Sequence, residues 1–442
     1  MMNRHLRPLL QNRLLHNIVT LYGVQACTYL LPLLTLPYLA RVLGPTGWGA
    51  VSFSQAIGAT IAIAVEYGFD FSATRETARQ EKNRHQLAEL VSGVLAAKIL
   101  LSVICLCVAM TVRKYALHIA PSPALFWASA IWGVAQGINM LWFFQGLERM
   151  KLMGSIDIGG RILATVGIFL IVHRSSDGWK VMASQALGCI ISHAVTVFFA
   201  FREVGFRFPA PALIWNALRL GWPMFIFRAS QSLSGTANSL IMGALAPVSA
   251  LGIFMGAERI TWVARQALWP INQALYPRLS KQMQSSPDTA ARTVRYSLAI
   301  IGGLSTAFAG ILVLEAPLMV RIVLGPQYEA AIPTLRVFGL TLPLVALCVV
   351  LSFQWILPLG LDRQFNFVVL TSGIINIVLG ILLVPKLSHL GMALALFLQQ
   401  AYALAASCWI LRAPHLNPLR REKQTFAGVL ADCVLQGDRG SN

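Results

Sequence analysis

Charged side chains within apolar segments are the residues of this sequence best placed to do chemistry. Six basic residues fall inside apolar runs long enough to cross a membrane: Lys98, Arg161, Arg228, Arg259, Arg265 and Arg336. The acidic residues of these runs are fewer: Glu66, Asp157 and Glu258, with Glu315 at the end of a run. A central arginine costs roughly 2.5–3.5 kcal/mol on membrane-insertion scales, so several in one chain need a compensating role. The excess of cations predicts a cavity for a phosphate-bearing ligand, because the planar guanidinium group matches phosphate oxygens.

Ion pairing within the protein is the alternative explanation for these charges. Helical spacing places Arg161 one turn from Asp157. Glu258 is a further candidate partner, for Arg259 and Arg265. Because such pairing leaves basic residues over, the anionic ligand is the preferred interpretation.

Polar residues also follow one face of several runs at the helical period. They are Arg228, Gln231, Ser232, Gly235, Asn238 and Ser239 on 217–242, and Glu258, Arg259, Trp262, Arg265, Gln266, Trp269 and Gln273 on 249–275. Shorter stripes on 14–40 and 48–69 hold Asn17, Thr28, Thr35, Ser52, Gln55 and Glu66. Lipid cannot solvate these groups, so they should face protein or a water-filled cavity. The predicted substrate-binding residues are Arg228, Arg259, Arg265, Arg161, Lys98, Arg41, Gln231, Asn238 and Trp262.

Two carboxylates border the cytoplasmic end of the run 48–69. Glu66 and Asp70 lie there, close to Arg75 in the sequence. They would carry protons for ion-coupled transport or form an interfacial ion-pair cluster, and the cluster is the preferred interpretation. Asp157 and Glu258 complete the set of predicted coupling or ion-pair residues.

The chain contains none of four common motifs of phosphate binding, metal binding and hydrolytic catalysis. It contains no GxxxxGK[ST] phosphate loop and no HExxH, CxxC or GxSxG pattern. We therefore expect no cofactor, no metal and no enzymatic activity. The net charge of +18 is scattered among apolar runs and forms no basic domain, which argues against a nucleic acid partner.

Transmembrane helices are the elements that must position these residues. Hydrophobic residues make up 56% of the 442 and charged residues 12%, against roughly a quarter in soluble domains. With about 20 apolar residues per crossing, the expected spans are 14–40, 48–69, 90–111, 124–146, 152–172, 180–201, 217–242, 249–275, 296–315, 332–357, 364–385 and 388–411. The predicted fold is an all-α polytopic membrane protein of about twelve transmembrane helices, in two six-helix bundles around a central cavity.

The predicted organisation is a bundle over 1–201, a cytoplasmic linker over 202–216, a second bundle over 217–411 and a basic tail over 412–442. Of the 35 Lys and Arg residues, 22 fall at the termini and in the connections on the same side, and 7 in the opposite connections. Positive charge marks the cytoplasmic side, so both termini are predicted to be cytoplasmic. The tail is expected to form an interfacial helix around 426–434 or to be disordered.

A weak internal repeat marks the first hairpin of each bundle. RVLGPTGWGAV (41–51) matches GALAPVSALGIF (243–254) with one insertion, pairing Pro45 with Pro247 and Gly49 with Gly252. Six spans separate the copies, so both share one orientation. Two halves related by an axis along the membrane normal are typical of transporters with a midplane site.

Several stretches also resemble a known family. LPLLTLPYLARVLGPTGWGAVSFSQA (31–56), EYGFDFSATRETAR (66–79), WFFQGLERMK (142–151), ALYPRLS (274–280) and VLGPQYEAAIPTLRVFG (323–339) are similar to the polysaccharide-repeat-unit flippases. These are the Wzx-type O-antigen translocases of the multidrug/oligosaccharidyl-lipid/polysaccharide exporter superfamily. The similarity covers about residues 10–412 and is specific as a set.

The resemblance implies a central cationic cavity lined by the first, second, seventh and eighth helices. It also implies that an undecaprenyl-pyrophosphate-linked oligosaccharide is flipped across the bacterial inner membrane by alternating access, coupled to an ion gradient. Polysaccharide polymerase and chain-length proteins are the implied partners besides the lipid bilayer. Arg259, eighteen residues before Pro277, looks like the helix 8 arginine of the related lipid II flippases. Their first-helix arginines have no clear counterpart here.

Three alternatives to the flippase are weighed against it. A multidrug exporter of the same superfamily would carry cations, which the excess of intramembrane arginine disfavours. A membrane enzyme of polysaccharide assembly (a polymerase, ligase or acyltransferase) is disfavoured by the short external connections, because polymerases and ligases usually carry a large external loop. A scaffold without transport would leave the cost of the buried charges unexplained.

Overall fold

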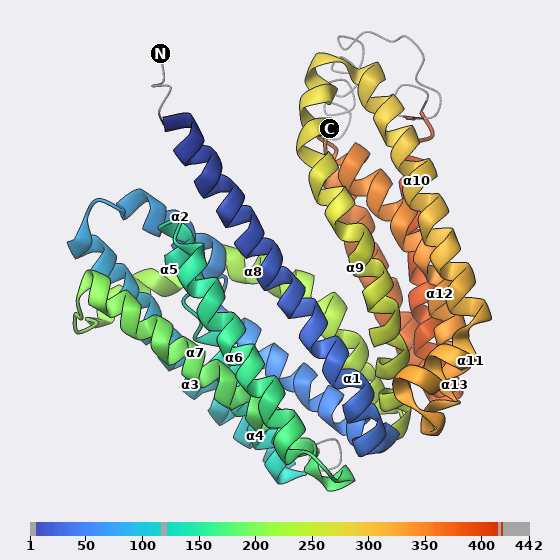
Figure 1. The fold of residues 1–442 in the computed structure, drawn as a ribbon, viewed down its shortest axis with the longest axis horizontal. Helices are drawn as coiled ribbons and strands as arrows, with labels where there is room; N and C mark the ends of the chain where they lie inside the picture. Colours follow the sequence, from blue (N-terminus) through green and yellow to red (C-terminus); the bar gives the residue numbers. More distant parts are fainter. Residues whose placement is uncertain (1–5, 116–121, 414–416, 419–442) are drawn as a thin grey trace, which may run out of the picture. The chain divides into compact units, whose positions relative to one another are not determined.

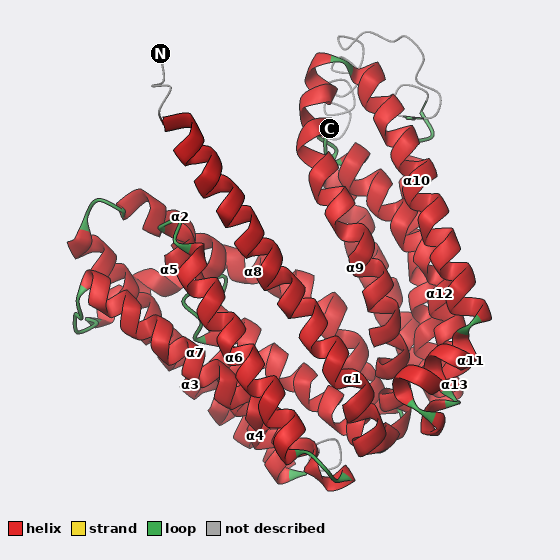
Figure 2. Cartoon of the chain, in the orientation of Figure 1, coloured by secondary structure: helices red, strands yellow, loops and turns green. Residues whose placement is uncertain are grey.

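The computed structural model describes residues 6–115, 122–413 and 417–418. Side chains are described from Leu30 onward, apart from 227, 229–234, 267–274, 276–278, 280 and 284. These residues form helices and loops without any β-strand (Figure 2). The all-α prediction is therefore confirmed.

The chain divides into two compact units, Met1–Gly252 and Ile253–Asn442 (Figure 1). The first contains α1 (Leu6–Glu66), α2 (Phe69–Gln80), α3 (Arg84–Tyr115), α4 (Pro123–Gly137), α5 (Leu141–Gly146), α6 (Met150–Ile171), η1 (Ser175–Asp177), α7 (Gly178–Val204) and α8 (Pro211–Leu245). The second contains α10 (Pro287–Leu314), α11 (Ala316–Met319), η2 (Val320–Leu324), η3 (Pro326–Tyr328), α12 (Ala331–Val349), η4 (Val350–Ile356) and α13 (Asp362–Ile410). Helix α9 (Val248–Ser285) begins in the first unit and continues in the second.

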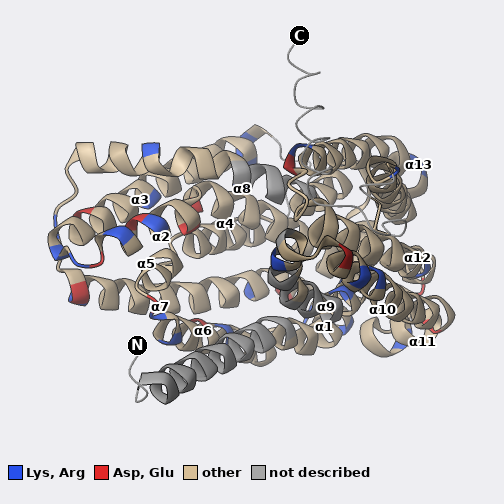
Figure 3. Cartoon of the chain, turned by 90° about the horizontal axis from the view of Figure 1, so that it is seen from above, with Lys and Arg blue, Asp and Glu red and all other residues tan. Residues whose placement is uncertain are grey.

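Every predicted span has a counterpart among these helices. The longest two each supply two spans, because α1 is broken at Gly44 (φ 65°) and α13 at Ser388 (φ 53°). Eight stretches of the described residues are long and apolar enough to cross a membrane. Most of the residues that are coloured in Figure 3 are neither basic nor acidic. The protein is therefore a multi-pass helical membrane protein, as predicted.

Two predicted connections are largely helical. Most of 70–89 belongs to α2 and α3, and most of 276–295 to the end of α9 and the start of α10. The sequence of α2, FDFSATRETARQ, is too polar to be a span. It still buries Phe69 and Ala73 in a cluster with Trp142 and Phe143, because one face of the helix is apolar.

Helix α8 packs against α1, α2 and α3, so the first compact unit includes it. The sequence places this helix, as the span 217–242, in the second bundle. The compact units divide near residue 252 instead of within 202–216. The division of the chain into two six-helix bundles, over 1–201 and 217–411, stays a prediction.

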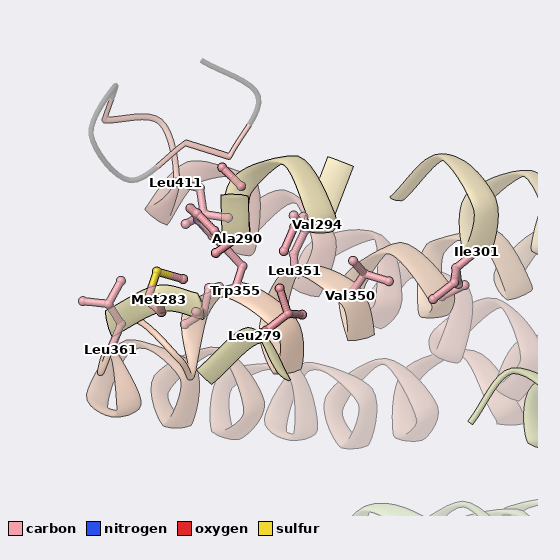
Figure 4. Close-up of a cluster of buried hydrophobic side chains, with 13 residues drawn as sticks. Leu279, Met283, Ala290, Val294, Ile301, Val350, Leu351, Trp355, Leu361 and Leu411 are labelled. Atoms are coloured by element: carbon pink, nitrogen blue, oxygen red, sulfur yellow. The ribbon is translucent and has the colours of Figure 1, made fainter. Parts of the chain in front are cut away.

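A buried cluster at one end of the second unit ties α9, α10 and η4 together (Figure 4). Trp355 of η4 is fully buried, and Met283, Ala290 and Val294 belong to the same cluster. Helix α12 packs against both α10 and α13 in the same unit (Figure 1). This packing gives the second unit an apolar core of its own.

The two glycines aligned by the internal repeat contact each other within the first unit. A Cβ atom built on Gly49 would overlap the carbonyl oxygen of Val248 and lie 2.8 Å from the Gly252 nitrogen. A Cβ atom on Gly252 would overlap the carbonyl oxygen of Pro45 and lie 2.9 Å from the Gly49 nitrogen. The two hairpins therefore cross backbone to backbone at equivalent positions. Only glycine allows so close an approach.

Candidate functional site

A turn with left-handed backbone angles brings the carboxylates of the first unit together. Tyr67 (φ 49°) and Gly68 (φ 73°) separate the end of α1 from the start of α2. A Cβ atom on Gly68 would lie 2.6 Å from backbone atoms of Met224 and Phe225, so α8 packs directly on this turn. The carboxylates that flank the turn therefore face the next turn of α8.

Arg228 of α8 binds both of these carboxylates. Its Nη2 atom donates to Oε2 of Glu66 at 2.8 Å and to Oδ2 of Asp70 at 3.2 Å. The exposed fractions of the three side chains are 35%, 16% and 14%. Arg228 also lies over the ring of Phe71, 5.7 Å from its centroid. The guanidinium group thus joins α1, α2 and α8 at one point.

A second cation completes the cluster from α3. Lys98 is fully buried and donates from Nζ to the carbonyl oxygen of Asn139 at 2.8 Å. The side-chain amide of Asn139 donates in turn to Oε1 of Glu66 at 3.0 Å. We call Glu66, Asp70, Lys98, Asn139 and Arg228 the charged cluster. Two carboxylates and two cations balance each other, which limits the cost of placing them within spans.

The two carboxylates of the charged cluster are groups that can take up a proton. These carboxylates, at the end of α1 and the start of α2, are held between cations and a single amide. Among the described residues no group of His, Cys, Asp and Glu has the arrangement of a metal site. Gain or loss of one proton would unbalance the cluster and change the contacts that hold α8 to α1.

The predicted residues of α9 lie in a different environment. Arg259 is half-buried and lies over the ring of Trp262, 5.1 Å from its centroid. Arg265 is exposed and lines a pocket of the second unit. Neither arginine forms an ion pair with Glu258 or with another carboxylate of the described residues. Glu258 therefore forms no direct salt bridge with either arginine, although it interacts electrostatically with both.

The other predicted residues are dispersed. Arg161 and Asp157 form the expected ion pair on α6, with Nε and Oδ2 2.8 Å apart. Arg41 is exposed near the break in α1, and Arg75 is exposed on α2. Asn238 is half-buried on α8.

The side chain of Gln231 and the predicted tail helix at 426–434 lie outside the described residues.

Sequence patterns missed one member of the cluster. Asn139 lies between α4 and α5, within a segment that the sequence predicts as part of one continuous span. Asn139, two residues after Gly137, was the available signal for this break.

The fold is similar to the folds of two solved membrane proteins. It is similar to the lipid II flippase MurJ in an inward closed conformation, with a TM-score of 0.70 and 12% identity over 90% of this chain and 88% of that one. An inward-facing MATE family multidrug resistance transporter of the MOP superfamily gives a TM-score of 0.62 and 17% identity, covering 89% of this chain and 97% of that one. At these identities the likeness concerns the fold alone.

Sequence relatives identify the family. The profile of the family "Polysaccharide biosynthesis protein" matches residues 14–283, so the chain belongs to this family. A "Putative O-antigen transporter" of Escherichia coli (strain K12) is 29% identical over 86% of this chain and 92% of its own length. A protein of the same name from Shigella dysenteriae is 26% identical over 86% and 95%. The resemblance to polysaccharide-repeat-unit flippases is confirmed.

Proposed function

We propose that the protein flips undecaprenyl-pyrophosphate-linked oligosaccharide repeat units across the bacterial inner membrane by alternating access, with both termini in the cytoplasm. Membership of the polysaccharide biosynthesis protein family and the two relatives named as O-antigen transporters support this substrate class. The fold shared with MurJ supports a flipping mechanism. Polysaccharide polymerase and chain-length proteins would act on the delivered units.

The observation that carries the proposal is the pair of arginines on α9. Arg259 and Arg265 lie in the middle of a predicted span and form no salt bridge among the described residues, whereas Arg161 and Arg228 do. An anionic headgroup would balance these charges, and pyrophosphate oxygens match guanidinium donors. The lipid tail would remain in the bilayer while the headgroup crosses near these side chains.

Removal of both charges is expected to stop transport. In proteoliposomes the variant Arg259→Gln/Arg265→Gln should flip the lipid-linked repeat unit at least about a hundredfold more slowly, since each charged hydrogen bond contributes about 1.5–3 kcal/mol. Arg292→Gln, an exposed arginine on α10, is the matched control and should flip at the wild-type rate. A fluorescent protein fused to the C-terminus reports the amount of folded protein, and its fluorescence requires a cytoplasmic terminus.

Normal flipping by the double variant would contradict the anion site. Transport of a cationic dye in place of the lipid-linked oligosaccharide would favour the multidrug exporter instead. A fluorescent protein that stays dark on folded, membrane-inserted protein would contradict the orientation.

Coupling to a proton gradient is the second part of the proposal. The charged cluster supports it, because protonation of one carboxylate there would weaken the hold of Arg228 on α1 and α2. An imposed proton gradient should accelerate flipping several-fold in the wild type and have no effect in Asp70→Asn, which cannot take up the proton. Equal acceleration of both proteins would exclude Asp70 as the coupling group.

A further inference from the structure

A polar pocket lies within the second unit, between α9, α12 and the second half of α13. Its volume is about 80 Å³, several times the roughly 10–15 Å³ that one water needs. The polar side chains that line it are Thr261, Arg265, Thr341, Gln399 and Gln400. Phe338 and three aliphatic side chains form the rest of its wall.

The pocket lies at the depth where polar groups are most costly. Thr261 and Arg265 belong to the middle of the predicted span 249–275, and the glutamines to the middle of 388–411. Lipid offers such groups no hydrogen bonds, so polar side chains converging here need protein, water or a ligand. A pocket that holds all of them together is suited to a polar ligand.

The mixture of donors and acceptors indicates what kind of group fits. Thr261 donates to the Ala257 carbonyl at 3.1 Å and Thr341 to the Val337 carbonyl at 2.7 Å. Both hydroxyl oxygens therefore keep only acceptor capacity for the pocket. The amides of Gln399 and Gln400 offer donors and acceptors, and Arg265 offers donors.

A cation is a poor match for this lining. No carboxylate is among the residues that line the pocket, and the guanidinium group of Arg265 would repel a positive charge. A simple anion would use the donors and leave the threonine and amide oxygens unmatched. A hydroxyl group both donates and accepts, so a sugar ring can satisfy both kinds of partner, with its apolar face against Phe338.

We propose that this pocket is a subsite for a sugar residue of the transported headgroup, with Arg265 at the junction between sugar and pyrophosphate. This inference rests on the proposed flippase function. It assigns a role to Thr341 and Gln399, which the polar stripes of the sequence did not include. Gln399 and Gln400 form an adjacent polar pair in the run LFLQQAY (396–402), which was the available signal.

The test compares two lipids that differ only in their sugars. Binding of the lipid-linked repeat unit, purified from the source bacterium, and of undecaprenyl pyrophosphate is measured on the purified full-length protein by thermophoresis. Wild type should bind the sugar-bearing lipid more tightly. Thr341→Val/Gln399→Leu should weaken binding of that lipid about tenfold, the equivalent of one or two hydrogen bonds, and leave the bare lipid unaffected. Thr306→Val removes the hydroxyl of an exposed threonine on α10 that does not line the pocket, and it should behave as wild type.

The possible outcomes separate this inference from the proposed function. A double variant that retains the wild-type preference for the sugar-bearing lipid overturns the subsite, and so does an equal loss for both lipids. A wild-type protein that binds neither lipid overturns the proposed function itself. Should the double variant not fold, binding of the two lipids is measured with Gln399→Asn instead. This variant keeps the amide and withdraws it by one methylene. A several-fold loss for the sugar-bearing lipid alone is then expected, and no loss overturns the subsite.

Discussion

Arg228→Gln should lower the free energy of unfolding of the detergent-solubilised protein by about 3 kcal/mol, measured by chemical or thermal denaturation. The substitution leaves Glu66 and Asp70 within the membrane region with Lys98 as their remaining cation. Breaking a buried ion pair by removing one partner costs about 3–5 kcal/mol. The low end of that range applies because the exposed fraction of the Arg228 side chain is 35%.

A compensating substitution separates lost charge balance from lost packing. Arg228→Gln/Asp70→Asn leaves one carboxylate, Glu66, and one ammonium, Lys98, so the charged cluster is again neutral. We expect the double variant to recover stability to within about 1 kcal/mol of the wild type, and the coupling energy between the two sites to be clearly non-additive. If Arg228→Gln is as stable as wild type, the ion pairs do not hold α8 in place. If the double variant is less stable than Arg228→Gln, charge balance is not the cause.

The partners of Arg228 show where sequence reasoning reaches its limit. The helical period places Arg228 on a polar face of its helix, and the apolar composition places that face away from lipid. Neither property tells which residue lies opposite, and Glu66 and Asp70 are 162 and 158 residues away in the chain. Neighbours in sequence suggested Arg75 as their partner, but the left-handed turn at Gly68 directs these carboxylates to α8. Periodicity predicts a face, and long-range packing selects its contacts.

Apolar patterning, by contrast, predicted the spans well. Each span depends on a local property, a run of about 20 residues that lipid can solvate, and helix formation there needs no distant partner. The polar segment that forms α2 lacks this property and was expected to be a connection. Its helix depends on burial of Phe69 and Ala73 against α5 and its neighbours, which only the folded unit provides.

Gly49→Ala and Gly252→Ala should be among the most damaging single substitutions in the chain. Each adds a methyl group that overlaps a backbone carbonyl oxygen, of Val248 or of Pro45, and lies less than 3 Å from a backbone nitrogen. Backbone atoms cannot rotate away as a side chain can, so the two helices must separate. We expect a loss of at least about 3 kcal/mol, at or above the upper end of the usual cost of overpacking, and little folded protein in the membrane.

A glycine in open surroundings provides the matched control. Gly159 lies on α6, and a Cβ atom added to it would have no neighbouring atom within 4 Å, so Gly159→Ala should be neutral or stabilise its helix by up to about 1 kcal/mol. The measurement is the melting temperature of each variant together with its yield from membranes. Melting temperatures for Gly49→Ala and Gly252→Ala equal to that of Gly159→Ala would show that the crossing tolerates a wider spacing.

The crossing at Gly49 and Gly252 also allows a test of how the two hairpins move during transport. We propose that the hairpins pivot where Gly49 meets Gly252, because the contact there is between backbones. Larger residues at this point would fix the helices at one separation. Any folded fraction of Gly49→Ala or Gly252→Ala should therefore bind the lipid-linked repeat unit but flip it at least about tenfold more slowly than wild type, which corresponds to a barrier about 1.4 kcal/mol higher. Folded variants that flip at the wild-type rate would place the pivot elsewhere in the chain.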